Sequence, residues 1–95
     1  MQINYTVDAF ASLSNVVNFI ESQNTFGAGS RWLDKFEKHL LKSFITPESI
    51  HFCNNKAFHQ LKLRCINFND WIIAFSIQDT SVLIEAILHT SRLTD

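Results

Sequence analysis

Four side chains in the second half of the chain carry donor atoms that a zinc ion prefers. They are His51, Cys53, His59 and Cys65. Structural zinc sites usually show paired ligands, such as Cys-x-x-Cys or His-x-x-x-His, and these residues have no such pairing. The segment 27–30 reads Gly-Ala-Gly-Ser and lacks the lysine of a phosphate-binding loop. We therefore expect no metal site and no cofactor.

The cysteines and the N-terminus bear on the compartment. The segment Met1–Asn4 lacks the basic start and the apolar stretch of a secretory signal. No apolar run approaches the ~20 residues that a membrane span needs. We therefore predict a cytoplasmic protein without membrane contact, in which Cys53 and Cys65 are buried free thiols. A disulfide between them is the alternative, since two strand residues can face each other.

A second group of candidate residues is basic and lies in the last third of the chain: Lys62, Arg64, His89 and Arg92. His89 falls at the expected end of a strand, where a side chain can reach a ligand. The chain as a whole is not basic, because 8 Lys and Arg residues oppose 9 Asp and Glu residues. A protein that binds nucleic acid strongly and nonspecifically usually carries a clear basic excess. Only a small local patch is compatible with this balance.

The elements that position these residues can be recognised from hydrophobic periodicity. Leu61–Cys65 alternates apolar and polar residues, 71–77 is an almost unbroken apolar run, and 82–88 is a third apolar run. Short polar segments at 67–70 and 78–81 separate these runs and have the composition of turns. We predict that the chain ends in a three-stranded antiparallel meander.

The first half of the chain shows a helical period instead. Residues 3–7 favour a strand, and Asp8 is a candidate cap for the helix that follows. Apolar residues spaced by three and four indicate amphipathic helices over Ala9–Gln23 and Arg31–Phe44, with a glycine-containing turn between them. We interpret residues 50–58 as a loop.

These elements follow the order β-α-α-β-β-β in a single domain over residues 1–95. We predict an α+β fold in which a helical hairpin packs on one face of a small, mostly antiparallel four-stranded sheet. The first and second strands should run antiparallel, because two helices reverse the chain twice between them. No helix is left to cover the other sheet face.

Strand alternation predicts which side chains lie on that open face. If Leu61, Leu63 and Cys65 face the helices, Lys62 and Arg64 point outward. The same argument applied to the last strand places Leu83, Glu85, Ile87 and His89 outward. The face is then either a platform for a partner, edged by exposed Leu83 and Ile87, or an ordinary solvated surface with scattered charges.

Taken together, the chain resembles the RelE/ParE superfamily of toxins from type II toxin–antitoxin modules over nearly its full length. No single segment is diagnostic, and the order and spacing of several segments carry the resemblance. These segments are Tyr5-Thr6-Val7, the turn Asn24-Thr25…Ala28…Arg31-Trp32, Leu61–Arg64, Asp70–Ile77 and Ile87–Arg92. The resemblance implies the fold above and a cognate antitoxin that holds the toxin in a hetero-oligomer. We place the antitoxin contact at Leu83 and Ile87.

The third strand distinguishes two branches of this superfamily. The ribosome-dependent mRNA endonucleases of the RelE kind use an arginine and a tyrosine-like residue there, whereas this chain has Ile72 and Phe75. Neither side chain can stabilise a phosphorane or activate a 2′-hydroxyl. The chain is therefore more similar to the ParE branch, which inhibits DNA gyrase by binding and has no catalytic residues.

On this basis we predict a non-enzymatic toxin whose target-binding residues are Lys62, Arg64, His89 and Arg92. The first alternative is a ribosome-dependent endonuclease that uses the same basic set on mRNA. The second alternative is a non-toxic interaction domain.

Overall fold

The computed structural model of the protein describes residues 2–92, without the side chain of Arg92. The predicted order β-α-α-β-β-β is confirmed, with two short 3-10 turns and one short helix added. In chain order the elements are β1 (Gln2–Tyr5), α1 (Val7–Gln23), α2 (Ala28–Ser43), η1 (Pro47–Ser49), α3 (Lys56–Gln60), β2 (Arg64–Phe68), β3 (Trp71–Ile77), β4 (Ser81–His89) and η2 (Thr90–Arg92).

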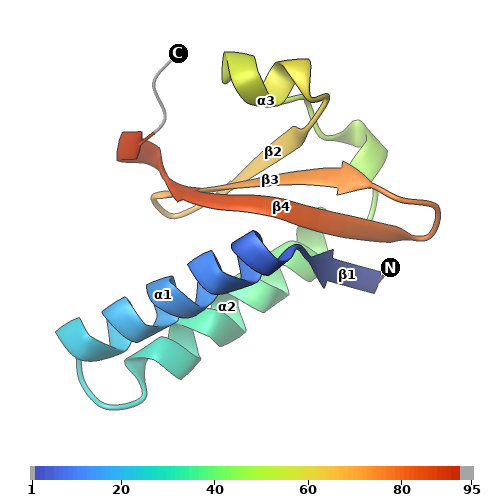
Figure 1. The fold of residues 1–95 in the computed structure, drawn as a ribbon. Coiled ribbons are helices and arrows are strands. Elements are labelled where there is room, and N and C mark those ends of the chain that lie inside the picture. Colours follow the sequence, from blue (N-terminus) through green and yellow to red (C-terminus); the bar gives the residue numbers. More distant parts are fainter. Residues whose placement is uncertain (1, 93–95) are drawn as a thin grey trace.

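The four strands form one mixed sheet in the order β1-β4-β3-β2. β2, β3 and β4 make the predicted antiparallel meander, and β1 pairs with β4 in parallel (Figure 1). It follows that β1 and β2 run in the same direction, so the prediction that they are antiparallel is wrong. The reason lies in the segment between α2 and β2. Residues around Phe52 run antiparallel to β2, which adds one more reversal of chain direction before β2 begins.

α1 packs one narrow stripe against the sheet. The helix begins one residue after Thr6, whose Oγ1 accepts a hydrogen bond from the Ala9 backbone N–H at 3.1 Å, so Thr6 rather than Asp8 is the N-cap. Ala9, Leu13 and Val16 are buried, whereas Phe10 is 61% exposed. The predicted helical spacing is therefore confirmed, but Phe10, which also fits that spacing, lies outside the buried stripe.

α2 follows the prediction closely. Phe36, Leu40 and Phe44 are spaced by four residues and are almost fully buried. Asp34 and Lys38 form an exposed ion pair at 3.0 Å on the opposite side, which contributes little because solvent screens it. Among the described residues, no helix is both long and apolar enough to cross a membrane.

The turn between the helices is held by a carboxylate. Glu21 accepts hydrogen bonds from the backbone N–H groups of Gly27 and Gly29, both at 2.8 Å. These two bonds lower the pKa of Glu21, and nearby Arg31 lowers it further. The helices also approach closely here, because a Cβ on Gly29 would lie 2.8 Å from the carbonyl oxygen of Val17.

The sheet separates two apolar clusters. The larger one lies between the helices and the sheet and includes Phe36, Ile73 and Ile84. The smaller one lies on the opposite face around Cys53 and Ala74, where Phe58 of α3 packs against it. Figure 1 shows α3 on the side of the sheet away from α1 and α2. The prediction that this face is uncovered is therefore wrong for the part beneath α3.

Cys53 and Cys65 form a disulfide with a Cα–Cα distance of 4.9 Å, which corrects the expectation of two free thiols. The backbone brings them together: Cys53 N–H donates to the Leu63 carbonyl at 2.9 Å, and Phe52 bridges to Arg64 as a strand partner. The expectation was based on compartment alone, and the pairing of residues 51–53 with β2 was not visible in the sequence.

Candidate functional site

The predicted basic residues do not form one cluster. Arg64 begins β2 and pairs with Phe75, whereas His89 ends β4 and pairs with Trp71. Because Phe75 and Trp71 are four residues apart on β3, the two positions are separated by about 13 Å along the strand. Lys62 is exposed in the turn before β2, where its φ is 60°.

The guanidinium of Arg64 is bound within the protein. It donates hydrogen bonds to the backbone carbonyls of Glu48, at 3.1 Å, and Ile50. Its Cζ also lies 4.3 Å from the centre of the Phe52 ring. Arg64 therefore links η1 and the segment after it to the edge of β2, and it is not presented to a target.

The outward parity predicted for Arg64 is wrong as well. Cys65 pairs with Ala74 and belongs to the cluster on the α3 side, so Arg64 has the opposite orientation. Leu63 and Cys65 share a face as predicted, but that face is the α3 side of the sheet, and Leu61 lies in the turn before β2. Leu61 is 68% exposed, although it was expected to face the helices.

A register shift in β4 also changes which residues face outward. Ala86 pairs with Ala74 and Ile84 pairs with Phe75, so Glu85 is an extra residue between them. The alternation of side-chain direction along β4 is therefore interrupted at Glu85, so Leu83 and Ile87 do not share a face. Ile87 is 2% exposed and packs in the core beneath the helices, which corrects the prediction that it is an exposed antitoxin contact. Leu83 is half-buried and pairs with Ser76.

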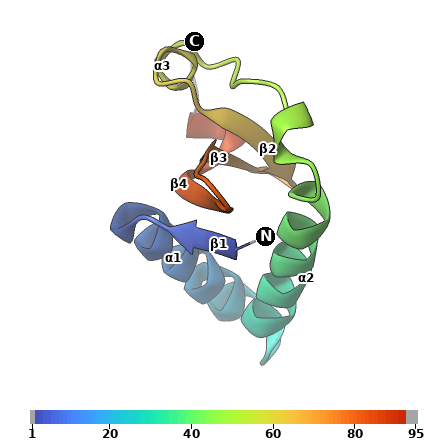
Figure 2. The ribbon, with the colours of Figure 1, turned by 90° about the vertical axis from the view of Figure 1, so that its right-hand side faces the viewer.

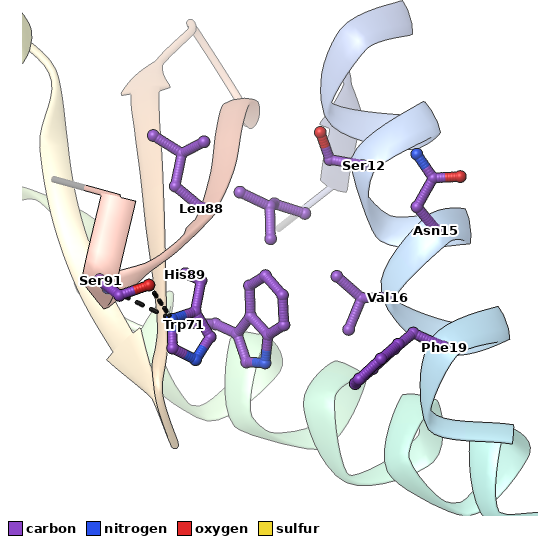
Figure 3. A pocket seen from close by; sticks show the side chains of 9 residues that line it. Ser12, Asn15, Val16, Phe19, Trp71, Leu88, His89 and Ser91 are labelled. Carbon is purple, nitrogen blue, oxygen red and sulfur yellow. Dashed lines mark hydrogen bonds between the residues drawn. The ribbon is translucent and has the colours of Figure 1, made fainter. Parts of the chain in front are cut away.

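A concave site lies next to His89, between α1 and the end of the sheet (Figure 3). We call it the α1–β4 groove, and its volume is about 500 Å³. One wall is α1 and the other is formed by β3, β4 and η2. Its lining residues are Ser12, Asn15, Val16, Phe19, Trp71, Ile87, Leu88, His89 and Ser91.

His89 is held in a defined orientation in this groove. Ser91 donates its backbone N–H to His89 Nδ1 at 3.2 Å, and Ser91 Oγ lies 2.9 Å from the same nitrogen (Figure 3). Because Nδ1 accepts these contacts, the neutral ring carries its proton on Nε2. The Trp71 ring lies edge-on to the imidazole with 5.1 Å between the ring centres. His89 therefore offers an Nε2–H donor beside an aromatic surface.

The described lining of the groove combines apolar surface with hydrogen-bonding groups. Among the described residues it contains no Asp, Glu, Lys or Arg. Within residues 2–91, no group of His, Cys, Asp or Glu side chains is arranged to hold a metal ion.

Of the basic residues predicted to bind a target, only His89 lies in the groove. Lys62 and Arg64 lie elsewhere, and the side chain of Arg92 lies outside the described residues. Sequence reasoning missed the α1 wall, because Ser12 and Asn15 are polar residues that lie outside the apolar repeat of the helix. The available signal was Phe19, an aromatic residue on that polar side that is 62% exposed.

Neither the known protein-family models nor the curated proteins contain a match to this chain.

Proposed function

We propose that this protein is the toxin component of a type II toxin–antitoxin module and that it inhibits growth by binding a cellular target such as DNA gyrase. The proposal rests on the resemblance to the RelE/ParE superfamily, to which the observed element order corresponds. An antitoxin encoded beside it neutralises the toxin in a hetero-oligomer.

The third strand is the observation that favours binding over catalysis. Phe75 is fully buried, so the position that carries a tyrosine-like residue in the endonuclease branch cannot contact a substrate. Ile72 replaces the arginine of that branch and provides no charge. Arg64 is engaged with two carbonyl oxygens inside the protein. Together these features leave no pair of groups for phosphodiester cleavage.

The α1–β4 groove is the surface that we assign to the target. Val16 and Leu88 provide apolar contact, and His89 and Asn15 provide hydrogen-bonding groups. A groove with this mixture suits an apolar side chain of a target protein with one neighbouring acceptor. The described lining contains no Lys or Arg, so this part of the groove offers no cation to a nucleic-acid backbone.

Expression of the protein without its partner tests the proposal. A gyrase-directed toxin produces filamentous cells and a DNA-damage response, and Phe19→Ala in the groove wall should abolish both. Phe26→Ala is the matched control, since Phe26 is 95% exposed in the turn between the helices and does not line the groove. Normal growth without either phenotype would instead support the alternative that the protein is a non-toxic interaction domain.

The ribosome-dependent mRNA endonuclease remains the second candidate, because His89 lies in the groove at the end of β4 and its ring is held by Ser91. This candidate predicts rapid cleavage of translated mRNA in phase with codons, and its loss in His89→Ala. Such cleavage, with no DNA-damage response, would replace gyrase by the ribosome and mRNA as the target.

A further inference from the structure

The two edges of the sheet are protected very differently. At the β2 edge, residues 51–53 lie alongside the strand: Phe52 bridges to Arg64, and Cys65 N–H donates to the His51 carbonyl at 3.4 Å. At the β1 edge, no strand of the described chain lies on the side of β1 that faces away from β4. In Figure 2, β1 lies below β4 and above α1, with α2 to its right. β1 thus has no covering strand of the described chain on its free side, whereas the first residues of β2 are covered by residues 51–53.

β1 lacks the charged residues and the proline that often block an exposed edge, since its sequence is Gln-Ile-Asn-Tyr. Thr6 N–H donates to the Ile84 carbonyl at 3.0 Å, which directs the main chain of Thr6 toward β4. Because main-chain groups alternate along a strand, those of Ile3 and Tyr5 point to the free side. They are placed to pair with an added strand.

An apolar groove runs beneath this edge. Ile3 and Tyr5 of β1 form one wall, and Leu40 and Leu41 of α2 form the other, enclosing about 220 Å³. Leu41 is 61% exposed. Exposed Phe10 extends the apolar surface from the other helix, with its ring 6.5 Å from that of Tyr5. Side chains of an added strand that point toward the helices would be buried here.

One charge lies at this groove. Glu37 of α2 is the only charged residue in its lining, and it makes no ion pair with any residue in the described part of the chain. Burial raises the pKa of Tyr5, and the negative charge of Glu37 raises it further, consistent with a carboxylate close to the Tyr5 ring. A ligand of complementary charge would bring a cation to this point.

We propose that the β1 edge binds an extended segment of a partner protein, whose alternate apolar residues enter the groove and whose Lys or Arg pairs with Glu37. The main chain of that segment pairs with Ile3 and Tyr5. Identification of the partner as the antitoxin rests on the proposed function. The antitoxin contact then lies at β1, on the opposite side of β4 from β3, instead of at Ile87.

Synthetic peptides test this binding mode on the purified protein. One peptide alternates Val and Thr around a central Lys, and the second carries Glu at that position. In NMR titrations the Lys peptide should slow hydrogen exchange of the Ile3 and Tyr5 amides and bind about threefold to fivefold more tightly than the Glu peptide. Glu37→Lys should reverse this preference. Glu48→Lys, an exposed carboxylate on η1, should leave it unchanged.

Two results would overturn the proposal. The first is that neither peptide slows exchange at Ile3 and Tyr5. The second is that the protein alone sediments as a dimer with these amides already slow to exchange, which would assign the edge to a second copy of the chain. The peptide assay requires no toxicity, so absence of growth inhibition would refute the toxin assignment while leaving strand addition intact.

Discussion

The β2 edge and the β1 edge end the same sheet in opposite ways. The β2 edge is covered by a neighbouring segment of the chain, which the Cys53–Cys65 disulfide and the Arg64 guanidinium hold in place. The β1 edge is bordered by apolar side chains and the carboxylate of Glu37, and no strand of the described residues covers it. An edge closed by covalent and charged contacts is specialised for stability, whereas an uncharged open edge is suited to association. Four predictions test this contrast.

The largest loss of stability is expected from breaking the disulfide that closes the β2 edge. The disulfide closes a loop between cysteines 12 residues apart, and removal of a loop of this size costs about 3 kcal/mol in the free energy of unfolding. Urea unfolding of the protein with and without reductant measures this loss. The double variant Cys53→Ser with Cys65→Ser should be insensitive to reductant. Equal stability with and without reductant would mean that the disulfide does not hold this edge.

The next effect concerns Arg64. Arg64→Ala removes two charge-assisted hydrogen bonds and the contact with Phe52, and we expect a loss of about 2 kcal/mol in unfolding free energy. Lys62→Ala is the matched control. It removes an exposed cation in the adjoining turn and should change stability by less than about 0.5 kcal/mol. If both variants unfold alike, the bonds of Arg64 to Glu48 and Ile50 contribute nothing.

A smaller effect on stability is expected at the turn between α1 and α2, which lies away from both sheet edges. The pKa of Glu21 is lower in the folded state than its ordinary value of 4.5, because Gly27 and Gly29 donate to the ionised carboxylate. The carboxylate of Glu21 therefore binds a proton more readily in the unfolded chain than in the folded one. As a result, Glu21 stabilises the fold at pH values above 4.5. This contribution disappears as pH falls through the lowered pKa.

Glu21→Gln should therefore unfold more easily than the wild-type protein at neutral pH, and the difference should shrink in acid. Urea midpoints measured from pH 7 down to about pH 3 provide the test. Asp34→Asn is a suitable control, since its carboxylate lies in an exposed ion pair with Lys38. A constant difference between Glu21→Gln and wild type at every pH would exclude the charged form as the cause.

The smallest change in stability is expected at the open edge. Asn4 is exposed on β1, so Asn4→Lys should alter the free energy of unfolding by less than about 0.5 kcal/mol. The same substitution places a lysine on the edge strand, which discourages strand pairing. It should weaken both peptides to a similar extent, because its side chain lies on the face opposite Glu37. NMR titration against the wild-type protein measures the difference. Unchanged binding would indicate that the peptide does not approach β1 as a strand.

The helices and the meander could be predicted because their signals are local. In α2, Phe36, Leu40 and Phe44 repeat at the helical period and are all buried. In β3, the unbroken apolar run matches a central strand with neighbours on both sides. The candidate site was harder to predict, because the α1–β4 groove combines Ser12 and Asn15 with Trp71 and His89, which are far apart in the sequence.

The sequence by itself determined the element order and the two helices, since hydrophobic spacing within one element depends only on neighbouring residues. Three features were decided only by the tertiary structure. The additional residue Glu85 in β4 reversed the strand alternation and buried Ile87. The pairing of residues 51–53 with β2 brought the two cysteines together and enclosed Arg64. The parallel pairing of β1 with β4 left β1 at the edge. Each depends on contacts between segments distant in the chain, which no local period can specify.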